Sequence, residues 1–219
     1  MRALVTGGTG RLGEAIAGRL ERDGWSVLAV GRADGDVSRP DEARALVDRA
    51  ARELGGLDLL VNGAGDGFAP KPAEQLTEQD WDAAFGVTAK GSFFVTQAAA
   101  PHLREAHGCV VMLEDVAGYQ AWPSFAAHSA AKAAQAMLTR VLARALAPEV
   151  RVCGVAPGPV AVAPGQEERR AAETLLGRVG SPDDVADAVA FLAGAGFVTG
   201  TTLFVDGGRS LESAAWPRP

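Results

Sequence analysis

Between an apolar run and an amphipathic one stand eight residues, Thr6-Gly7-Gly8-Thr9-Gly10-Arg11-Leu12-Gly13. The preceding run, Arg2–Thr6, has the length and composition of a short buried strand, and Arg11–Arg22 repeats its apolar positions with the period of a helix. Glycines at such a strand-to-helix turn let the backbone approach a pyrophosphate, which then rests on the helix N-terminus. The stretch therefore predicts a nucleotide-binding loop at the start of an α/β fold.

The same alternation of strands and helices continues along the chain. The later predicted strands are Ser26–Val30, Leu57–Val61, Val110–Leu113, Val150–Val155 and Leu203–Val205. The later predicted helices are Pro40–Leu54, a helix capped by Thr77, Ala89–Ala106, Ser124–Ala147 and a helix that begins after Ser181. Apolar strands that alternate with helices imply a parallel sheet covered on both faces. We therefore predict an α/β fold over residues 1–219, a single-domain, Rossmann-type, doubly wound parallel sheet.

The composition suits one globular core and argues against several classes of function. The chain has 219 residues, of which 47% are hydrophobic. Its net charge is -6 and no basic stripe is present, so no nucleic-acid partner is expected. No run of about 18 apolar residues occurs, so we expect no membrane partner and a cytoplasmic location. Cys109 and Cys153 lie in apolar, strand-like runs and are expected to be buried thiols, and no metal site is predicted.

Three ionisable residues, Asp115, His128 and Lys132, are candidates for proton chemistry. His128 and Lys132 are four residues apart in an Ala-rich helical run, so their side chains share one helix face. Asp115 lies just after a predicted strand. A carboxylate, an imidazole and an ammonium brought together can handle protons in catalysis, although the same residues could instead form a surface ion cluster.

The end of the second strand, Val30-Gly31-Arg32, bears on the choice of cofactor. An acid at this tip would accept hydrogen bonds from a ribose 2′-hydroxyl, but Gly31 stands there and Arg32 follows. Because a guanidinium suits a 2′-phosphate, NADP(H) is predicted over NAD(H), unless Arg32 is simply solvated. Only three residues separate Arg32 from Asp36, so the helix that usually links the second and third strands is predicted to be missing, with a more open adenine end.

Further motifs are Asn62-Gly63-Ala64-Gly65, Lys132 on its helix, Pro157-Gly158 and the ending Val198-Thr199-Gly200…Val205-Asp206-Gly207-Gly208. Together with the glycine loop they resemble the short-chain dehydrogenase/reductase family across essentially the whole chain. The resemblance implies an NADP(H)-dependent oxidoreductase. It places at the cofactor the residues Gly7, Thr9, Arg11, Leu12, Gly13, Arg32, Asp36, Val37, Asn62, Gly63, Ala64, Lys132, Pro157 and Gly158.

The chain departs from this family at the catalytic positions. The usual Asn, Ser and Tyr of the family fall at Thr88, Asp115 and His128. Asp115 in place of Ser, with Arg11 in the glycine loop, is similar to the pteridine reductase and dihydromonapterin reductase branch. In that branch an aromatic residue stacks on the pterin, and Phe68 is close to that place, although it could equally anchor its loop. The resemblance therefore implies Arg11, Phe68 and Asp115 as substrate contacts.

The predicted function is NADPH-dependent reduction of a pterin-like C=N bond. Asp115 and His128 would manage the proton, and Lys132 would position the nicotinamide ribose. Two alternatives remain open, a general carbonyl reductase acting for example on a 3-oxoacyl thioester, and a catalytically silent NADP-binding protein. Residues 161–178 are predicted to form a substrate lid and 211–219 a tail. The family resemblance also implies a homotetramer or a homodimer, packed through the long central helices.

Overall fold

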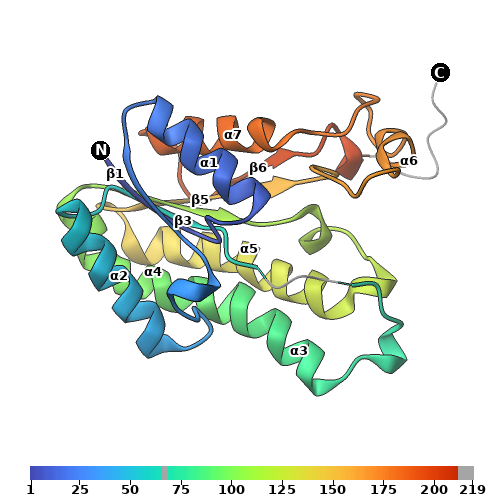
Figure 1. Cartoon of the computed structure of the whole chain (residues 1–219), viewed down its shortest axis with the longest axis horizontal. Coiled ribbons are helices and arrows are strands. Elements are labelled where there is room, and N and C mark those ends of the chain that lie inside the picture. Colours follow the sequence, from blue (N-terminus) through green and yellow to red (C-terminus); the bar gives the residue numbers. More distant parts are fainter. Residues whose placement is uncertain (66–68, 212–219) are drawn as a thin grey trace.

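The computed structural model describes residues 1–65 and 69–211, and its centre is a sheet of six strands (Figure 1). The strands are β1 (Arg2–Thr6), β2 (Ser26–Val30), β3 (Leu59–Asn62), β4 (Cys109–Leu113), β5 (Arg151–Pro157) and β6 (Thr202–Val205). Their order is β2-β1-β3-β4-β5-β6, and every neighbouring pair is parallel. The predicted doubly wound parallel sheet is therefore confirmed.

Helices cover both faces of the sheet, as Figure 1 shows. One face carries α1 (Arg11–Arg22) and α7 (Pro182–Gly194), and the other carries α2 (Pro40–Leu54), α4 (Ser92–Glu105) and α5 (Ala126–Leu146). The remaining helices are α3 (Glu78–Phe85), which precedes α4, and the short α6 (Glu167–Ala171), which follows β5.

Alternation along the buried strands divides the core between these two layers. In β1, Leu4 packs toward α2 and α4, whereas Ala3 and Val5 pack toward α1 and α7. The same period of two recurs in β4, where Val110 and Val111 belong to opposite cores. Leu113, the last residue of β4, therefore faces the same layer as Val111, toward α1 and α7.

Two helix starts follow the chemistry expected from the sequence. The hydroxyl of Thr77 accepts a hydrogen bond from the Asp80 amide, and the hydroxyl of Ser181 accepts one from the Asp184 amide. In both cases the acid bonds back to the capping residue, which satisfies amide donors that a helix start leaves open. The predicted caps at Thr77 and Ser181 are confirmed.

The segment after β2 contains only a 3-10 turn, Arg32–Asp34, before α2. No α-helix lies between Arg32 and Asp36, as the short spacing there predicted, and the predicted helix Pro40–Leu54 is α2, which connects β2 to β3. The classic doubly wound order places a further strand outside the second one, and within the described residues β2 is instead the edge of the sheet.

No helix in the described ranges is both long enough and apolar enough to span a bilayer.

Candidate active site

A cavity of about 620 Å³ lies at the carboxyl ends of β1, β3, β4 and β5. This is where open α/β sheets bind ligands, because the chain leaves β1 for one side of the sheet and later returns on the other. The cavity brings together most of the residues singled out by the sequence. Its lining includes Gly7, Thr9, Arg11, Leu12, Gly13, Arg32, Asp36, Val37, Gly63, Ala64, Asp115, His128, Lys132, Pro157 and Gly158.

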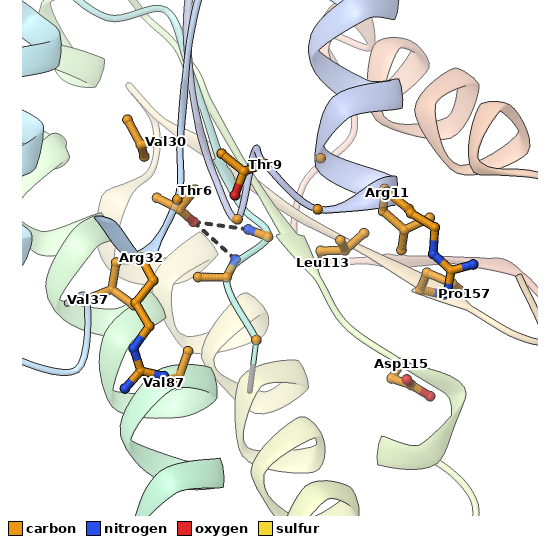
Figure 2. A pocket seen from close by; sticks show the side chains of 18 of the residues that line it. Thr6, Thr9, Arg11, Val30, Arg32, Val37, Val87, Leu113, Asp115 and Pro157 are labelled. Carbon is orange, nitrogen blue, oxygen red and sulfur yellow. Dashed lines mark hydrogen bonds between the residues drawn. The ribbon is translucent and has the colours of Figure 1, made fainter. Parts of the chain in front are cut away.

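The glycine loop has the geometry of an anion cradle. Gly7 has a φ of +66°, and a Cβ at that position would lie 2.4 Å from the carbonyl oxygen of Gly63. The Thr6 hydroxyl holds the two loops together, because it accepts from the amides of Gly63 (3.1 Å) and Ala64 (3.3 Å) (Figure 2). Helix α1 begins at Arg11, and its N-cap residue, Gly10, supplies no side-chain cap. Its first amide donors are therefore open to a bound phosphate.

Two arginines mark different parts of the cavity. In Figure 2, Arg32 and Arg11 lie well apart, on opposite sides of Thr9. Arg32 comes from the turn after β2, and Arg11 from the first residue of α1. Asp36 also lines the cavity, but its carboxylate accepts from the Ser38 amide and hydroxyl, and these bonds lower the pKa of Asp36. Because Arg11 and Arg32 lie apart in the same cavity, one elongated bound molecule could contact the guanidinium of Arg32 at one end and that of Arg11 at the other.

Asp115 and His128 meet at the cavity wall. The Nε2 atom of His128 lies 3.4 Å from Oδ2 of Asp115, while Oδ1 of Asp115 accepts from the Ala117 amide at 2.8 Å. The turn after β4 thus binds Oδ1 of Asp115 through the Ala117 amide, and Oδ2 of Asp115 is directed at the imidazole of His128. His128 is only 9% exposed, so the structure does not support a surface ion cluster.

Lys132 lies one helical turn beyond His128 on α5 and is 8% exposed. Its ammonium donates to the carbonyl oxygen of Leu113 at 2.6 Å and to Oε1 of Gln135 at 3.0 Å. Burial lowers the pKa of Lys132, and the nearby negative charges of Asp115 and Glu114 oppose this effect. The side chain also lines the cavity, so it can reach a bound molecule.

The sequence did not single out Glu114, which the structure places in the wall of the same cavity. Its carboxylate is 2% exposed and accepts from three hydroxyls, those of Tyr119 (2.5 Å), Thr139 (2.6 Å) and Thr202 (3.0 Å). Burial, and then the bond to Glu114, raise the pKa of the Tyr119 phenol. In the sequence, one feature could have indicated Glu114: it is a second acid, directly before Asp115, at the end of an apolar strand.

Other candidates are placed elsewhere. Asn62 is 2% exposed, and its amide donates to the Thr96 hydroxyl at 2.9 Å, so its side chain turns toward α4 instead of lining the cavity. Thr88 is buried and has no place in the lining of this cavity. Phe68 lies outside the described residues. Its assignment to the substrate stays a prediction.

The segment 161–178, predicted as a lid, begins at the cavity and ends away from it. Ala161 lines the cavity, whereas the Leu176 amide donates to the carbonyl oxygen of Gly207 at 3.1 Å. Of the predicted tail, Leu211 is described and the rest lies outside the described residues. In the part of the chain that the structure describes, no three His, Cys, Asp or Glu side chains gather as a metal site.

A family model described as Enoyl-(Acyl carrier protein) reductase matches residues 28–210. The chain is 38% identical to 4-formylbenzenesulfonate dehydrogenase from Comamonas testosteroni, with 95% of this chain and 97% of that protein covered. The chain belongs to the short-chain dehydrogenase/reductase family. That alignment runs over 245 positions, more than the 219 residues present here, so the relative carries segments that this family member lacks.

Solved structures place this short-chain dehydrogenase/reductase among oxidoreductases. It resembles the ligand-free aldohexose dehydrogenase of Thermoplasma acidophilum, with a TM-score of 0.92 and 26% identity over 100% of this chain and 97% of that one. It also resembles a 3-ketoacyl-(acyl-carrier-protein) reductase from Brucella melitensis complexed with NADH, with a TM-score of 0.88 and 30% identity over 95% and 98%. The chain is therefore an oxidoreductase of a family that binds nicotinamide cofactors.

Proposed function

We propose that this protein is an NADP(H)-dependent reductase in which His128, oriented by Asp115, supplies the proton. The observation that carries the proposal is the 3.4 Å approach of these two side chains at the wall of the cavity that also holds the glycine loop. An imidazole can change its charge near neutral pH, which suits a group that must both give and regain a proton.

The residues present fit a dinucleotide. The close approach of Gly7 to Gly63 and the uncapped start of α1 leave room and open donors for a pyrophosphate. Arg32 stands where a 2′-phosphate would need a cation, and this supports NADP(H) over NAD(H). Lys132 would hold the nicotinamide ribose through the part of its ammonium that faces the cavity. When bound, the reduced cofactor supplies a hydride.

The protein's own contribution is the proton. Asp115 keeps one oxygen on the Ala117 amide and directs the other at the His128 ring, so it fixes the orientation of the imidazole. The protonated imidazole then donates to the nitrogen or oxygen of the polarised double bond, and the adjacent carbon accepts the hydride. Neutral His128 afterwards regains a proton from water, which restores the site.

We propose a pterin-like C=N bond as the first candidate substrate. Asp115 in place of the family's usual Ser, and Arg11 at the cavity, support this choice because a flat heterocycle with several nitrogens needs both acceptors and donors. His128 also lines a neighbouring cavity of about 550 Å³, together with Thr88 and Ser124. Such a volume suits the body of a small ring substrate.

A carbonyl substrate is the second candidate, and the comparisons favour it. The relative from Comamonas testosteroni is named for a formyl compound and the structure from Brucella melitensis for a ketoacyl compound. The same proton donor would serve a C=O bond, because the oxygen that develops negative charge takes the place of the ring nitrogen.

Oxidation of NADPH and of NADH by the purified protein tests these proposals. The acceptors offered are dihydrobiopterin, dihydromonapterin, a 3-oxoacyl thioester and simple ketones. Turnover of a dihydropterin supports the first candidate, and turnover of carbonyl compounds alone supports the second. Cofactor binding without any turnover would contradict both candidates and favour a silent nucleotide-binding protein.

The variant His128→Gln tests the assigned proton donor. It should lower turnover roughly a hundredfold to ten-thousandfold, the usual contribution of a positioned acid, while cofactor affinity stays unchanged. Arg39→Ala is the matched control, because Arg39 is well exposed, pairs with Glu42 and is absent from the lining of the cavity. Full turnover in His128→Gln would remove His128 from the mechanism.

We also infer that the chain assembles as a homotetramer or homodimer. Met137 and Val141 lie four residues apart on α5 and are about half exposed, and Trp81 of α3 is 44% exposed. Apolar side chains of this size on neighbouring helices suit an interface between copies. Light scattering on the wild type and on Met137→Glu would test it, since a charge there should shift the mass toward the monomer.

A further inference from the structure

A chain of side-chain hydrogen bonds runs from Lys132 into the layer between α5 and α4. Lys132 Nζ donates to Oε1 of Gln135 at 3.0 Å, Nε2 of Gln135 donates to Oγ of Ser92 at 2.8 Å, and that hydroxyl donates to the carbonyl oxygen of Thr88 at 2.6 Å. Gln135 is fully buried and Ser92 is 4% exposed. Solvent therefore does not compete for these bonds.

The direction of this chain is fixed at both ends. An ammonium has only donors and a carbonyl oxygen only accepts, so the Gln135 amide and the Ser92 hydroxyl have one consistent orientation each. This series of hydrogen bonds ends at the carbonyl oxygen of Thr88, which belongs to a π-helical segment, Gly86–Gly91, between α3 and α4. Such segments break the regular register of a helix and often occur beside functional sites.

Gln135 also determines how the Lys132 ammonium is used. Two of its three N–H groups are taken by Oε1 of Gln135 and by the Leu113 carbonyl oxygen, and Gln135 is fully buried. The remaining donor is available on the side that lines the cavity. A buried ammonium needs such acceptors, because burial alone favours the neutral amine.

We propose that Gln135 is a positioning residue, which holds Lys132 as an ammonium and aims its free donor at the bound cofactor. The cofactor contact rests on the function proposed above, whereas the effect of Gln135 on Lys132 does not. The titratable groups that face Lys132 are Asp115 and Glu114 at the end of β4 and His128 on its own helix. All three are left intact by substitutions at Gln135.

The composition makes a direct test practical. The chain contains only three lysines, Lys71, Lys90 and Lys132, so selective ¹³C labelling of lysine gives three side-chain signals. Lys132→Arg identifies the signal of interest. Its chemical shift is followed with pH in the protein without ligand, so the result does not depend on turnover.

In Gln135→Leu the titration midpoint of Lys132 should fall by about one pH unit, because a charge-assisted bond that favours the ammonium is lost. In Gln135→Glu it should rise, because a carboxylate replaces the amide oxygen. Ser92→Ala, which breaks the chain one step further on, should lower it by less. Gln97→Leu makes the same change at an exposed position of α4 and should leave it unchanged.

An unchanged midpoint in Gln135→Leu overturns the proposal. If that variant does not fold, unchanged midpoints in both Gln135→Glu and Ser92→Ala overturn it instead. A shifted midpoint in a protein that turns over no substrate would leave the role of Gln135 standing and remove the proposed function. The proposed role of Gln135 and the proposed function can therefore each be contradicted without the other.

Discussion

Gly31 and Thr9 are in such close contact that a side chain at position 31 would collide with the hydroxyl of Thr9. A Cβ on Gly31 would lie 2.4 Å from Thr9 Oγ1 and 2.9 Å from its methyl group. Thr9 thus occupies the space that the first side-chain carbon of an acid at position 31 would need. The proposed preference for NADP(H) over NAD(H) would therefore depend on Thr9 as well as on Arg32.

This contact predicts the result of Gly31→Asp. Alone, the substitution should weaken binding of both NADH and NADPH by roughly fivefold to a hundredfold, because overpacking costs about 1 to 3 kcal/mol. Combined with Thr9→Ala, it should improve NADH binding relative to NADPH. Fluorescence titration of each cofactor gives the affinities, with Thr9→Ala alone as control. Tighter NADH binding by Gly31→Asp alone would show that Thr9 does not obstruct the site.

Arg32→Ala should weaken NADPH binding and leave NADH binding nearly unchanged. The lost charge-assisted hydrogen bond to a 2′-phosphate is worth about 1.5 to 3 kcal/mol, or roughly tenfold to a hundredfold in affinity. Arg39→Ala removes a nearby exposed guanidinium and should change neither affinity. Equal losses for both cofactors in Arg32→Ala would mean that Arg32 does not read the 2′-phosphate.

Asp115→Asn and His128→Gln should act as one unit. Because Asp115 works by orienting the imidazole, the double variant should turn over substrate about as slowly as His128→Gln alone. The measurement is a double-mutant cycle on kcat/KM with the best substrate found. Fully additive losses would indicate that the two side chains act independently, despite their 3.4 Å approach.

Asp58 should make stability depend on acid pH. Its carboxylate accepts from the backbone amide of Arg2 at 2.7 Å and from the guanidinium at 2.8 Å and 2.9 Å, and the guanidinium bonds contribute most to lowering the pKa of Asp58. A lowered pKa in the folded state stabilises the protein above the usual value near 3.9, and this stabilisation disappears as the pH falls through the folded-state value.

Asp58→Asn should therefore lower the free energy of unfolding at pH 7 by about 1 kcal/mol. The difference from the wild type should close in strongly acid solution. Urea unfolding across pH measures it, with Asp23→Asn as the control because that carboxylate belongs to an exposed pair with Arg19. A difference that persisted at the lowest pH would show that charge is not the cause.

Much of the fold was predictable because its signals are local. The glycine loop lies between its strand and its helix, and the caps at Thr77 and Ser181 each depend on an acid three residues later. The helical region predicted over Ala89–Ala106 is present, but its first residues belong to a π-helical segment, Gly86–Gly91, which runs directly into α4 (Ser92–Glu105). The sequence pattern did not distinguish the π-helical turn from the α-helix that follows.

The candidate site was predictable in its residue types but not in its contacts. Asp115, His128 and Lys132 follow from spacing and a strand end, and the structure brings them to one cavity. Glu114 and Gln135 were missed because their partners come from other strands and helices. A buried network of this kind depends on how α5 packs against the sheet, which no local pattern records.

Among the described residues β2 is the edge of the sheet, and at such an edge a member of this family can lose residues and keep its site. An outermost strand pairs on one side only, and its side chains lie furthest from the centre of the sheet, so its removal leaves the inner strands and their cores intact. Ser26 and Ala29 already face solvent. Insertions and losses during evolution can therefore accumulate at this margin, while the switch point between β1 and β3 stays as it is.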